Sequence, residues 1–203
     1  MNVIEENKKY LNKYKPKVPQ TIRVRNSFDC AIGKKNGGIS FYNGTTNQAI
    51  LYYNTKRMNC AILNFANSHY VGGGDLSCFT QEEELCKTIV NLYPSLKLCA
   101  DEKHKYNNFQ WWNRILYLSD MTLLREDSIQ SNKTYNVLHA PIQVSVITAA
   151  APNLHCVPSQ IRLFLDNPKK IFDQLENVIA TSCMTQIILN KQNNNKQNYL
   201  LLN

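Results

Sequence analysis

The chain has 203 residues, of which 43% are hydrophobic, and a formal net charge of +8 at pH 7. This length suits one α/β domain with a sizeable core, and no linker divides the sequence into two domains. No run of about 18 apolar residues is present, which excludes a membrane-spanning helix, and the Lys- and Asn-rich start is unlike a secretory signal. We therefore expect a single domain over residues 1–203, in an intracellular protein of the cytoplasm or nucleus.

The seven cysteines are an odd number and contain no C-x-x-C spacing. This pattern favours neither a disulfide framework nor a zinc ribbon, so reduced thiols are expected. The positive charge would suit an anionic ligand or a nucleic acid. Many of the lysines, however, lie before residue 18 or in residues 191–196, where a solvated face is the simpler explanation.

The first predicted element is a helix over residues 3–14, where apolar side chains recur at roughly helical spacing. Pro16 and Pro19 follow and would end it. We assign residues 1–19 to an N-terminal helical extension.

Next in the chain, residues 38–43 have the composition of a strand, and a turn at 44–46 leads into a helical stretch that reaches Met58. The apolar run at residues 60–66 is typical of a buried parallel strand. Further along, the apolar positions from Leu85 to Tyr93 share one helical face, which Pro94 would close.

Strands are also predicted at residues 114–118, 144–148 and 186–189, two helices within residues 161–183, and an Asn-rich tail at 191–203. Strands and helices thus alternate along most of the chain. Such alternation predicts an α/β fold with a mixed, mostly parallel sheet covered on both faces.

Residues 72–74 are three consecutive glycines, and six residues separate them from Gln-Glu-Glu at 81–83. Consecutive glycines allow backbone conformations closed to other residues and close approach to a ligand. The carboxylates open the helix that follows. One short segment therefore offers both a ligand cradle and an acid.

A capping box formed by Thr80 and Glu83, with Glu83 paired to Lys87 four residues later, would also explain the carboxylates. Taken alone, they are more simply read as helix caps. The glycines favour the ligand, because three in a row are costly in backbone entropy where only a turn is needed. A side chain added at Gly73 would then occupy ligand space.

Five segments of the chain form a recognisable set: Leu-Asn-Phe-Ala-Asn-Ser-His-Tyr-Val-Gly-Gly-Gly at 63–74, Gln-Glu-Glu-Glu-Leu-Cys at 81–86, Asn-Leu-Tyr-Pro-Ser-Leu at 91–96, Arg-Ile-Leu-Tyr-Leu-Ser-Asp-Met-Thr-Leu-Leu-Arg-Glu-Asp at 114–127 and Val-Ile-Thr-Ala-Ala-Ala-Pro-Asn at 146–153. Together they resemble the microbial-type poly(ADP-ribose) glycohydrolases of the macrodomain fold, over roughly residues 20–154. The resemblance implies a three-layer α/β/α sandwich that acts on ADP-ribose conjugates.

The resemblance also implies roles for individual residues. Glu83 would be the catalytic acid, and Glu82 would hold the hydroxyls of the distal ribose as the second catalytic residue. The expected substrate-binding residues are Asn67, Gly72, Gly73, Gly74, Gln81 and Phe79. For Phe79, stacking on a base or ribose and packing in the core are equally compatible with the sequence.

The implied chemistry is that of a glycosidase. A neutral Glu83 would protonate the oxygen leaving the anomeric carbon, and the resulting carboxylate would activate the attacking water. Its pKa would need to be raised by Glu82 and by partial burial. This route needs no metal and no cofactor. The expected partner is ADP-ribose or ADP-ribosylated protein, whether the modification is a polymer or a single ADP-ribose. We expect the protein to be a monomer and to have no membrane partner.

The chain departs from the family beyond Gly74, after which it has no glycine. Family members carry a second glycine-rich loop that wraps the diphosphate. Lys191 and Lys196 could replace its amides by charge. Otherwise the chain would be a weak or inactive ADP-ribose reader. A nucleic-acid-binding domain is the least favoured alternative, suggested by Trp111 and Trp112 among basic residues.

Overall fold

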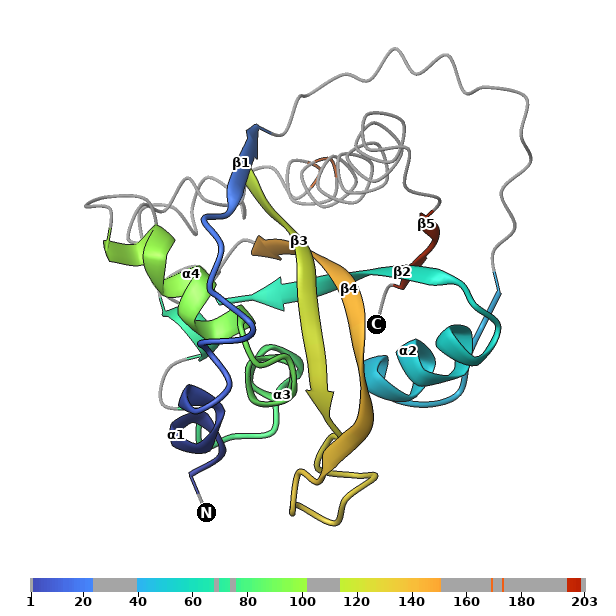
Figure 1. Cartoon of the computed structure of the whole chain (residues 1–203). Helices are drawn as coiled ribbons and strands as arrows, with labels where there is room; N and C mark the ends of the chain where they lie inside the picture. Colours follow the sequence, from blue (N-terminus) through green and yellow to red (C-terminus); the bar gives the residue numbers. More distant parts are fainter. Residues whose placement is uncertain are drawn as a thin grey trace.

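The computed structural model describes residues 2–23, 40–67, 70–73, 76–101, 114–150 and 197–201, together with Lys169 and Asp173. Figure 1 shows how the elements in these residues are arranged. In chain order they are α1 (Val3–Lys8), β1 (Gln20–Arg23), α2 (Thr46–Thr55), β2 (Asn59–Ala66), the 3-10 turn η1 (Val71–Gly73), α3 (Gln81–Thr88), α4 (Leu92–Asp101), β3 (Arg114–Arg125), β4 (Val137–Ala150) and β5 (Gln197–Leu201).

The five described strands form one sheet in the order β1-β3-β4-β2-β5. β2 pairs in parallel with both β4 and β5, whereas β3 pairs antiparallel with β1 and β4. The α/β class and the mixed sheet are confirmed. The expected predominance of parallel pairing is not found among the described strands. The connection from β3 to β4 at residues 126–136 carries no crossover helix, so the two strands pair antiparallel.

The core lies between one face of the sheet and helices α2, α3 and α4 (Figure 1). Ile62 of β2 packs there with Ile50 of α2, Leu85 of α3 and Leu96 of α4. The opposite face also buries apolar side chains, namely Leu63, Ile115, Tyr117, Ile147 and Ala149. Both faces of the sheet therefore bury apolar residues. The helices predicted within residues 161–183 lie outside the described residues, except that Lys169 and Asp173 are helical.

Local chemistry explains where α2 begins. The Thr45 hydroxyl accepts the N–H of Gln48, and the Gln48 side chain accepts the N–H of Thr45, so the two residues cap α2. The predicted turn into this helix and the buried strand at 60–66 are both confirmed. The predicted strand at 38–43 is wrong over residues 40–43, which form no strand. All four are exposed, and the contacts of Tyr42 with Tyr52 and of Ser40 with Tyr53 are side-chain contacts to α2, not the pairing with a strand that β-prone residues need.

Three other element boundaries differ from the sequence prediction. Helix α1 ends at Lys8, and turns occupy residues 9–13. Pro94 does not end a helix but lies in the first turn of α4. Proline is tolerated there because the backbone N–H groups of the first turn have no acceptor within the helix, so the N–H that proline lacks is not needed. Residues 197–201 of the Asn-rich tail form β5. The strand predicted at 186–189 lies outside the described residues.

Two observations bear on the class of protein. Cys60, Cys78 and Cys86 are free thiols, as expected for this part of the chain. Within the same described ranges, no helix combines the length and the apolar character required to cross a membrane.

Candidate active site

The glycine and glutamate motifs lie between the end of β2 at Ala66 and the start of α3 at Gln81. This confirms the predicted strand-loop-helix connection. It also puts the loop at the carboxyl end of a parallel strand, where ligands of α/β sheets commonly bind. Gly74 lies outside the described residues.

The buried carboxylate of Glu82 binds backbone amides from two parts of the loop. Glu82 is 2% exposed, and its Oε2 accepts the backbone N–H of Asn67 at 2.7 Å. Its Oε1 accepts the N–H of Gly72 at 3.3 Å. Three residues that the sequence assigns to the site are therefore joined directly, through backbone amides that hold one carboxylate.

Burial raises the pKa of Glu82 to about 7, and the neighbouring Glu83 contributes in the same direction. Hydrogen bonds from Asn67, Gly72 and the Asn64 side chain oppose the shift but do not cancel it. The sequence predicts a raised pKa for Glu83. In the structure, a raised pKa is found for its neighbour Glu82.

The raised pKa of Glu82 makes stability depend on pH. The unfolded chain ionises this group near 4.5 and the folded chain near 7, so its contribution is complete below pH 4.5 and is lost as pH rises through 7. The loss is on the order of 3 kcal/mol in the free energy of unfolding. We expect Glu82→Gln to lack this decline when urea unfolding is compared at pH 5 and pH 8. An equal decline in both proteins would contradict the assignment.

Asn64 is a site residue that the sequence analysis missed. It is fully buried in β2, donates from Nδ2 to the Thr148 hydroxyl at 3.2 Å, and hydrogen-bonds Glu82. Its Oδ1 has no hydrogen-bond partner among the described residues. The signal was present in the sequence, because the amide of Asn64 lies inside the apolar run at residues 60–66. Asn64 therefore helps to fix the orientation of the Glu82 carboxylate through this hydrogen bond.

Glu83 is also 2% exposed, and its two oxygens have different surroundings. Oε2 accepts the N–H of Thr80 at 3.1 Å and the Thr80 hydroxyl at 2.9 Å. The Glu83 half of the predicted capping box is therefore present. Oε1 makes no hydrogen bond to any described residue and lies against Gly73, where an added Cβ would be 2.8 Å from it. The cap thus occupies one oxygen and leaves the other facing the glycine loop.

The two described glycines of the motif adopt left-handed conformations, with φ of 74° at Gly72 and 79° at Gly73. An added Cβ at Gly72 would lie 2.8 Å from Leu76 and 3.1 Å from the ring of Tyr93. Both glycines are therefore required by their own protein neighbours. The space that Gly73 keeps free belongs to the Glu83 side chain, which is not what the sequence alone predicts.

Gln81 uses its side-chain amide to extend the sheet. Its Oε1 accepts the N–H of Phe65 at 2.8 Å, and its Nε2 donates to the carbonyl of Leu63 at 2.7 Å. Among the described residues, the pairing of β5 with β2 reaches Ile62, and this amide binds the next backbone groups of β2 as a strand would. Gln81 thus anchors α3 to β2, and both ends of its amide are engaged there.

Lys87 pairs with a different glutamate from the predicted one. Its Nζ lies 3.8 Å from Glu84 and donates to the carbonyl of Cys78 at 2.6 Å. The predicted pair with Glu83 does not form, because that carboxylate folds back onto Thr80. Glu84 in turn accepts the hydroxyl of Tyr135 at 2.5 Å, which ties α3 to the β3–β4 connection.

Phe79 is 53% exposed, so the interpretation of this residue as core is wrong. Its ring lies under Lys87 and Lys133, at 4.8 and 5.0 Å from their Nζ atoms. With Gln81 it also lines a cavity of about 680 Å³ beside the start of α2. A partly exposed ring in this position is available for stacking.

The described ranges contain no group of three or more His, Cys, Asp or Glu side chains positioned to hold a metal ion. Trp111, Trp112, Lys191 and Lys196, on which the alternatives depend, lie outside them.

The structure of this chain is similar to solved structures of bacterial enzymes. Poly(ADP-ribose) glycohydrolase (PARG) from Thermomonospora curvata matches with a TM-score of 0.65 at 18% identity, over 90% of this chain and 74% of that one. At this identity the likeness concerns the fold alone. PARG from Deinococcus radiodurans in complex with ADP-ribose matches with a TM-score of 0.52 at 25% identity. That match covers 70% of this chain and 57% of the Deinococcus chain.

None of the curated proteins matches this sequence. The family described as microbial-type PARG, catalytic domain, matches residues 2–126, which include the glycine loop, both buried glutamates and Asn67. On this match, and with the fold and loop geometry in agreement, the chain belongs to the microbial-type PARG catalytic domain family.

Proposed function

We propose that this protein hydrolyses the O-glycosidic bond that joins ADP-ribose to its substrate, with Glu83 as the general acid and base. The observation that carries the proposal is that the two carboxylate oxygens of Glu83 have different hydrogen-bond environments. Thr80 holds Oε2, while Oε1 faces Gly73 without a hydrogen-bond partner among the described residues. An anchored carboxyl group with one open oxygen beside a glycine loop suits proton transfer to a bound ligand.

In the proposed reaction, the protonated Glu83 gives its proton to the glycosidic oxygen as the bond to the anomeric carbon breaks. The electron pair of that bond leaves with the oxygen, and an oxocarbenium-like centre forms on the ribose. The Glu83 carboxylate then takes a proton from water while the water oxygen bonds to the anomeric carbon. ADP-ribose and the free hydroxyl of the substrate result, and Glu83 is protonated again.

Glu82 and Asn67 would hold the distal ribose in this reaction. Glu82 accepts two backbone amides, and a carboxylate has further lone pairs with which to accept ribose hydroxyls. Gly72 and Gly73 would bring the backbone close to the ligand from the same loop. The buried Glu82 thus links the conformation of the loop to the position of the ligand.

The direct test is a turnover assay of the full chain against poly- and mono-ADP-ribosylated protein, with free ADP-ribose as the measured product. We expect release of ADP-ribose from at least one of these substrates. Absence of release from both, together with absence of ADP-ribose binding in calorimetry, would contradict the proposal.

A second candidate is an ADP-ribose-binding module without turnover. The sequence feature that favours it is the absence of any glycine after Gly74, so no second glycine-rich loop is available for the diphosphate. Such a module would bind ADP-ribose in calorimetry and release none from modified protein. The same two measurements therefore separate the enzyme from the reader.

A further inference from the structure

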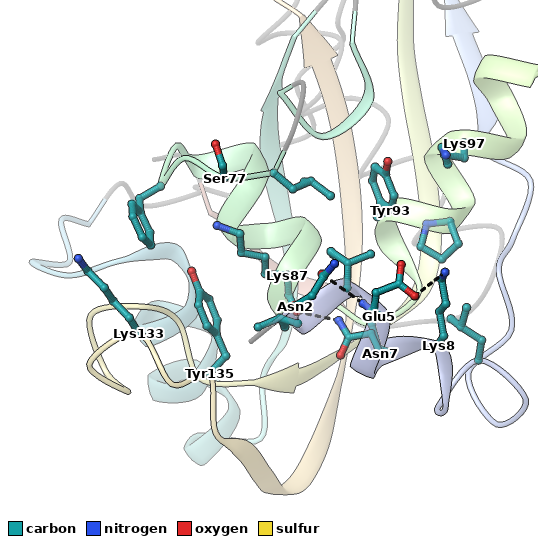
Figure 2. Close-up of a pocket in the computed structure, with 17 residues that line it drawn as sticks. Asn2, Glu5, Asn7, Lys8, Ser77, Lys87, Tyr93, Lys97, Lys133 and Tyr135 are labelled. Atoms are coloured by element: carbon teal, nitrogen blue, oxygen red, sulfur yellow. Dashed lines mark hydrogen bonds and ion pairs between the residues drawn. The ribbon is translucent and has the colours of Figure 1, made fainter.

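A basic groove of about 660 Å³ lies between α1, α3, α4 and the β3–β4 connection (Figure 2). Its charged lining residues are four lysines and one glutamate, which leaves a surplus of three positive charges. Neither Glu82 nor Glu83 lines it, and the proposed reaction uses none of its lysines. Its charged and aromatic lining residues are Lys8, Lys87, Lys97, Lys133, Glu5, Phe79, Tyr93 and Tyr135.

Two lysines of the groove are available to an anionic ligand. Lys8 is paired with Glu5 at 2.6 Å, and Lys87 is buried. Lys97 and Lys133 are exposed and form no ion pair with a carboxylate of the described residues. Figure 2 shows these two lysines on opposite sides of the groove. A ligand that meets both must therefore carry more than one anionic group.

Each of these two lysines lies over an aromatic ring. The Nζ of Lys97 is 5.4 Å from the centre of the Tyr93 ring, and that of Lys133 is 5.0 Å from the centre of the Phe79 ring. The lysine can bind a phosphate while the ring offers a face on which a base can stack.

The same pairing of lysine and ring continues in the arm, residues 9–17, which follows α1. Leu11 of the arm lines the groove. The Nζ of Lys9 lies 5.1 Å from the centre of the Tyr10 ring, and that of Lys13 lies 5.1 Å from the centre of the Tyr14 ring. Both lysines are exposed and form no ion pair with a carboxylate of the described residues. The groove and the arm thus carry four such pairs.

The backbone around Lys133 is strained. Asn132, Lys133 and Tyr135 all have positive φ, of 49°, 65° and 53°. Residues other than glycine seldom adopt these angles, and such strain concentrates in segments that bind ligands. The surrounding structure maintains it, since the N–H of Lys133 donates to the Ser128 carbonyl at 2.8 Å and the Tyr135 hydroxyl donates to Glu84 at 2.5 Å. This conformation puts Lys133 at the groove.

Both α1 and the arm are fixed to the rest of the chain before any ligand binds. The buried Arg125 donates to Asn7 at 2.8 Å and to Glu6 at 3.1 Å, both on α1. The N–H of Lys17 donates to the Ser95 hydroxyl of α4 at 2.9 Å. Preorganisation of this kind lowers the cost of ordering the surface on binding.

We propose that the groove and the arm bind single-stranded nucleic acid, as a surface additional to the glycohydrolase site. Successive phosphates of a single strand would meet the lysines, and its unpaired bases would stack on the rings beside them. In a duplex the bases are already stacked inside, and an acidic peptide has no base for the rings. The contacts are to phosphates and base faces, which RNA and DNA share, so both should bind with little dependence on sequence.

The first test is the double variant Lys97→Gln/Lys133→Gln, which removes two charges and keeps side-chain length. The probes are fluorescently labelled oligouridine and oligothymidine of about 12 nucleotides, within the usual site size of such surfaces. We expect the affinity of the full chain for both, measured by anisotropy, to fall about tenfold in the variant. The slope of log affinity against log salt should become shallower by about 1.4, since each lost phosphate contact removes about 0.7. Unchanged affinity would overturn the proposal.

The second test is Tyr10→Leu, which removes a ring and no charge. Its affinity for the same probes should fall about fivefold, at the low end for loss of one stacked base, while the salt slope stays as in the wild type. Unchanged affinity in this variant would show that the lysines act by charge alone, and the assignment to nucleic acid would fail.

Lys56→Gln is the matched control. Lys56 is exposed and lies over Tyr52, four residues before it, as Lys97 lies over Tyr93, but it is outside the groove. This variant should bind the oligonucleotides as the wild type does. Equal losses in Lys56→Gln and in the double variant would overturn the proposal. So would equally tight binding of polyglutamate of the same charge, or of a duplex of the same length.

These measurements are independent of the proposed function, because the oligonucleotides carry no ADP-ribose and no turnover is read. A chain that releases no ADP-ribose but shows the expected losses in both variants keeps this surface and lacks the proposed activity. Saturating ADP-ribose should leave oligonucleotide binding unchanged, because the surface lies outside the site of Glu82 and Glu83. Displacement of the oligonucleotide by ADP-ribose would overturn the assignment of a separate surface.

Discussion

Replacing Glu83 by Gln should lower kcat for ADP-ribose release about a thousandfold, the middle of the range for loss of a general acid and base. The amide cannot give a proton to the leaving oxygen. Its carbonyl oxygen can still accept the N–H and hydroxyl of Thr80, so the start of α3 should be preserved. We expect the calorimetric affinity for ADP-ribose to stay close to the wild-type value, because the loop amides of Asn67 and Gly72 are held by Glu82.

Glu84→Gln is the control for this variant. It removes a carboxylate from the adjacent residue, whose oxygens are bound to Tyr135 and to the N–H of Ser128 on the other side of α3. Its turnover should remain close to wild type. If Glu83→Gln and Glu84→Gln lose activity equally, the special role of Glu83 is refuted. If neither loses activity, the acid is another residue.

Gly73→Ala should reduce kcat about a hundredfold, because a misplacement of a catalytic group by about 1 Å has an effect of this size. The new Cβ would be 2.8 Å from Oε1 of Glu83 and 3.0 Å from its Cγ, so the carboxyl group must move. The positive φ of 79° adds a backbone strain of about 1 kcal/mol. Turnover and urea unfolding of the same preparation would measure the two effects separately.

Gly72→Ala provides the comparison, because its φ of 74° gives a similar backbone strain. Its Cβ would press on Leu76 and Tyr93 and not on Glu83. We expect a similar loss of stability and a smaller loss of kcat. Equal losses of kcat in the two alanine variants would show that strain in the loop, and not contact with Glu83, is responsible.

Much of the site could be predicted from the sequence because its parts are local. The Thr80 and Glu83 cap spans three residues, and the apolar strand at 60–66 leads directly into the glycine loop. A family motif of fixed spacing joins them. Such features depend on residues that are neighbours in the chain, and periodicity and composition report on neighbours.

Other features could not be predicted from the sequence, because they depend on residues far apart in the chain. The amide of Gln81 is engaged by Leu63 and Phe65 of β2, which no spacing within α3 reveals. Lys87 contacts Glu84 and the carbonyl of Cys78, because the Glu83 carboxylate is bound to Thr80. The strand predicted at residues 38–43 has β-prone residues, but its described part, 40–43, pairs with no strand, and pairing decides strand formation.

The sequence by itself determined the α/β class, the strand-loop-helix at the glycine motif and the pair of acids that follows it, since these arise from chain-local patterns. Tertiary structure decided the desolvation that raises the pKa of Glu82 to about 7, and it decided which oxygen of Glu83 stays open. It also decided that α1, α4 and the β3–β4 connection enclose a basic groove. Burial and electric field depend on everything packed around a group, and only the folded chain brings those groups together.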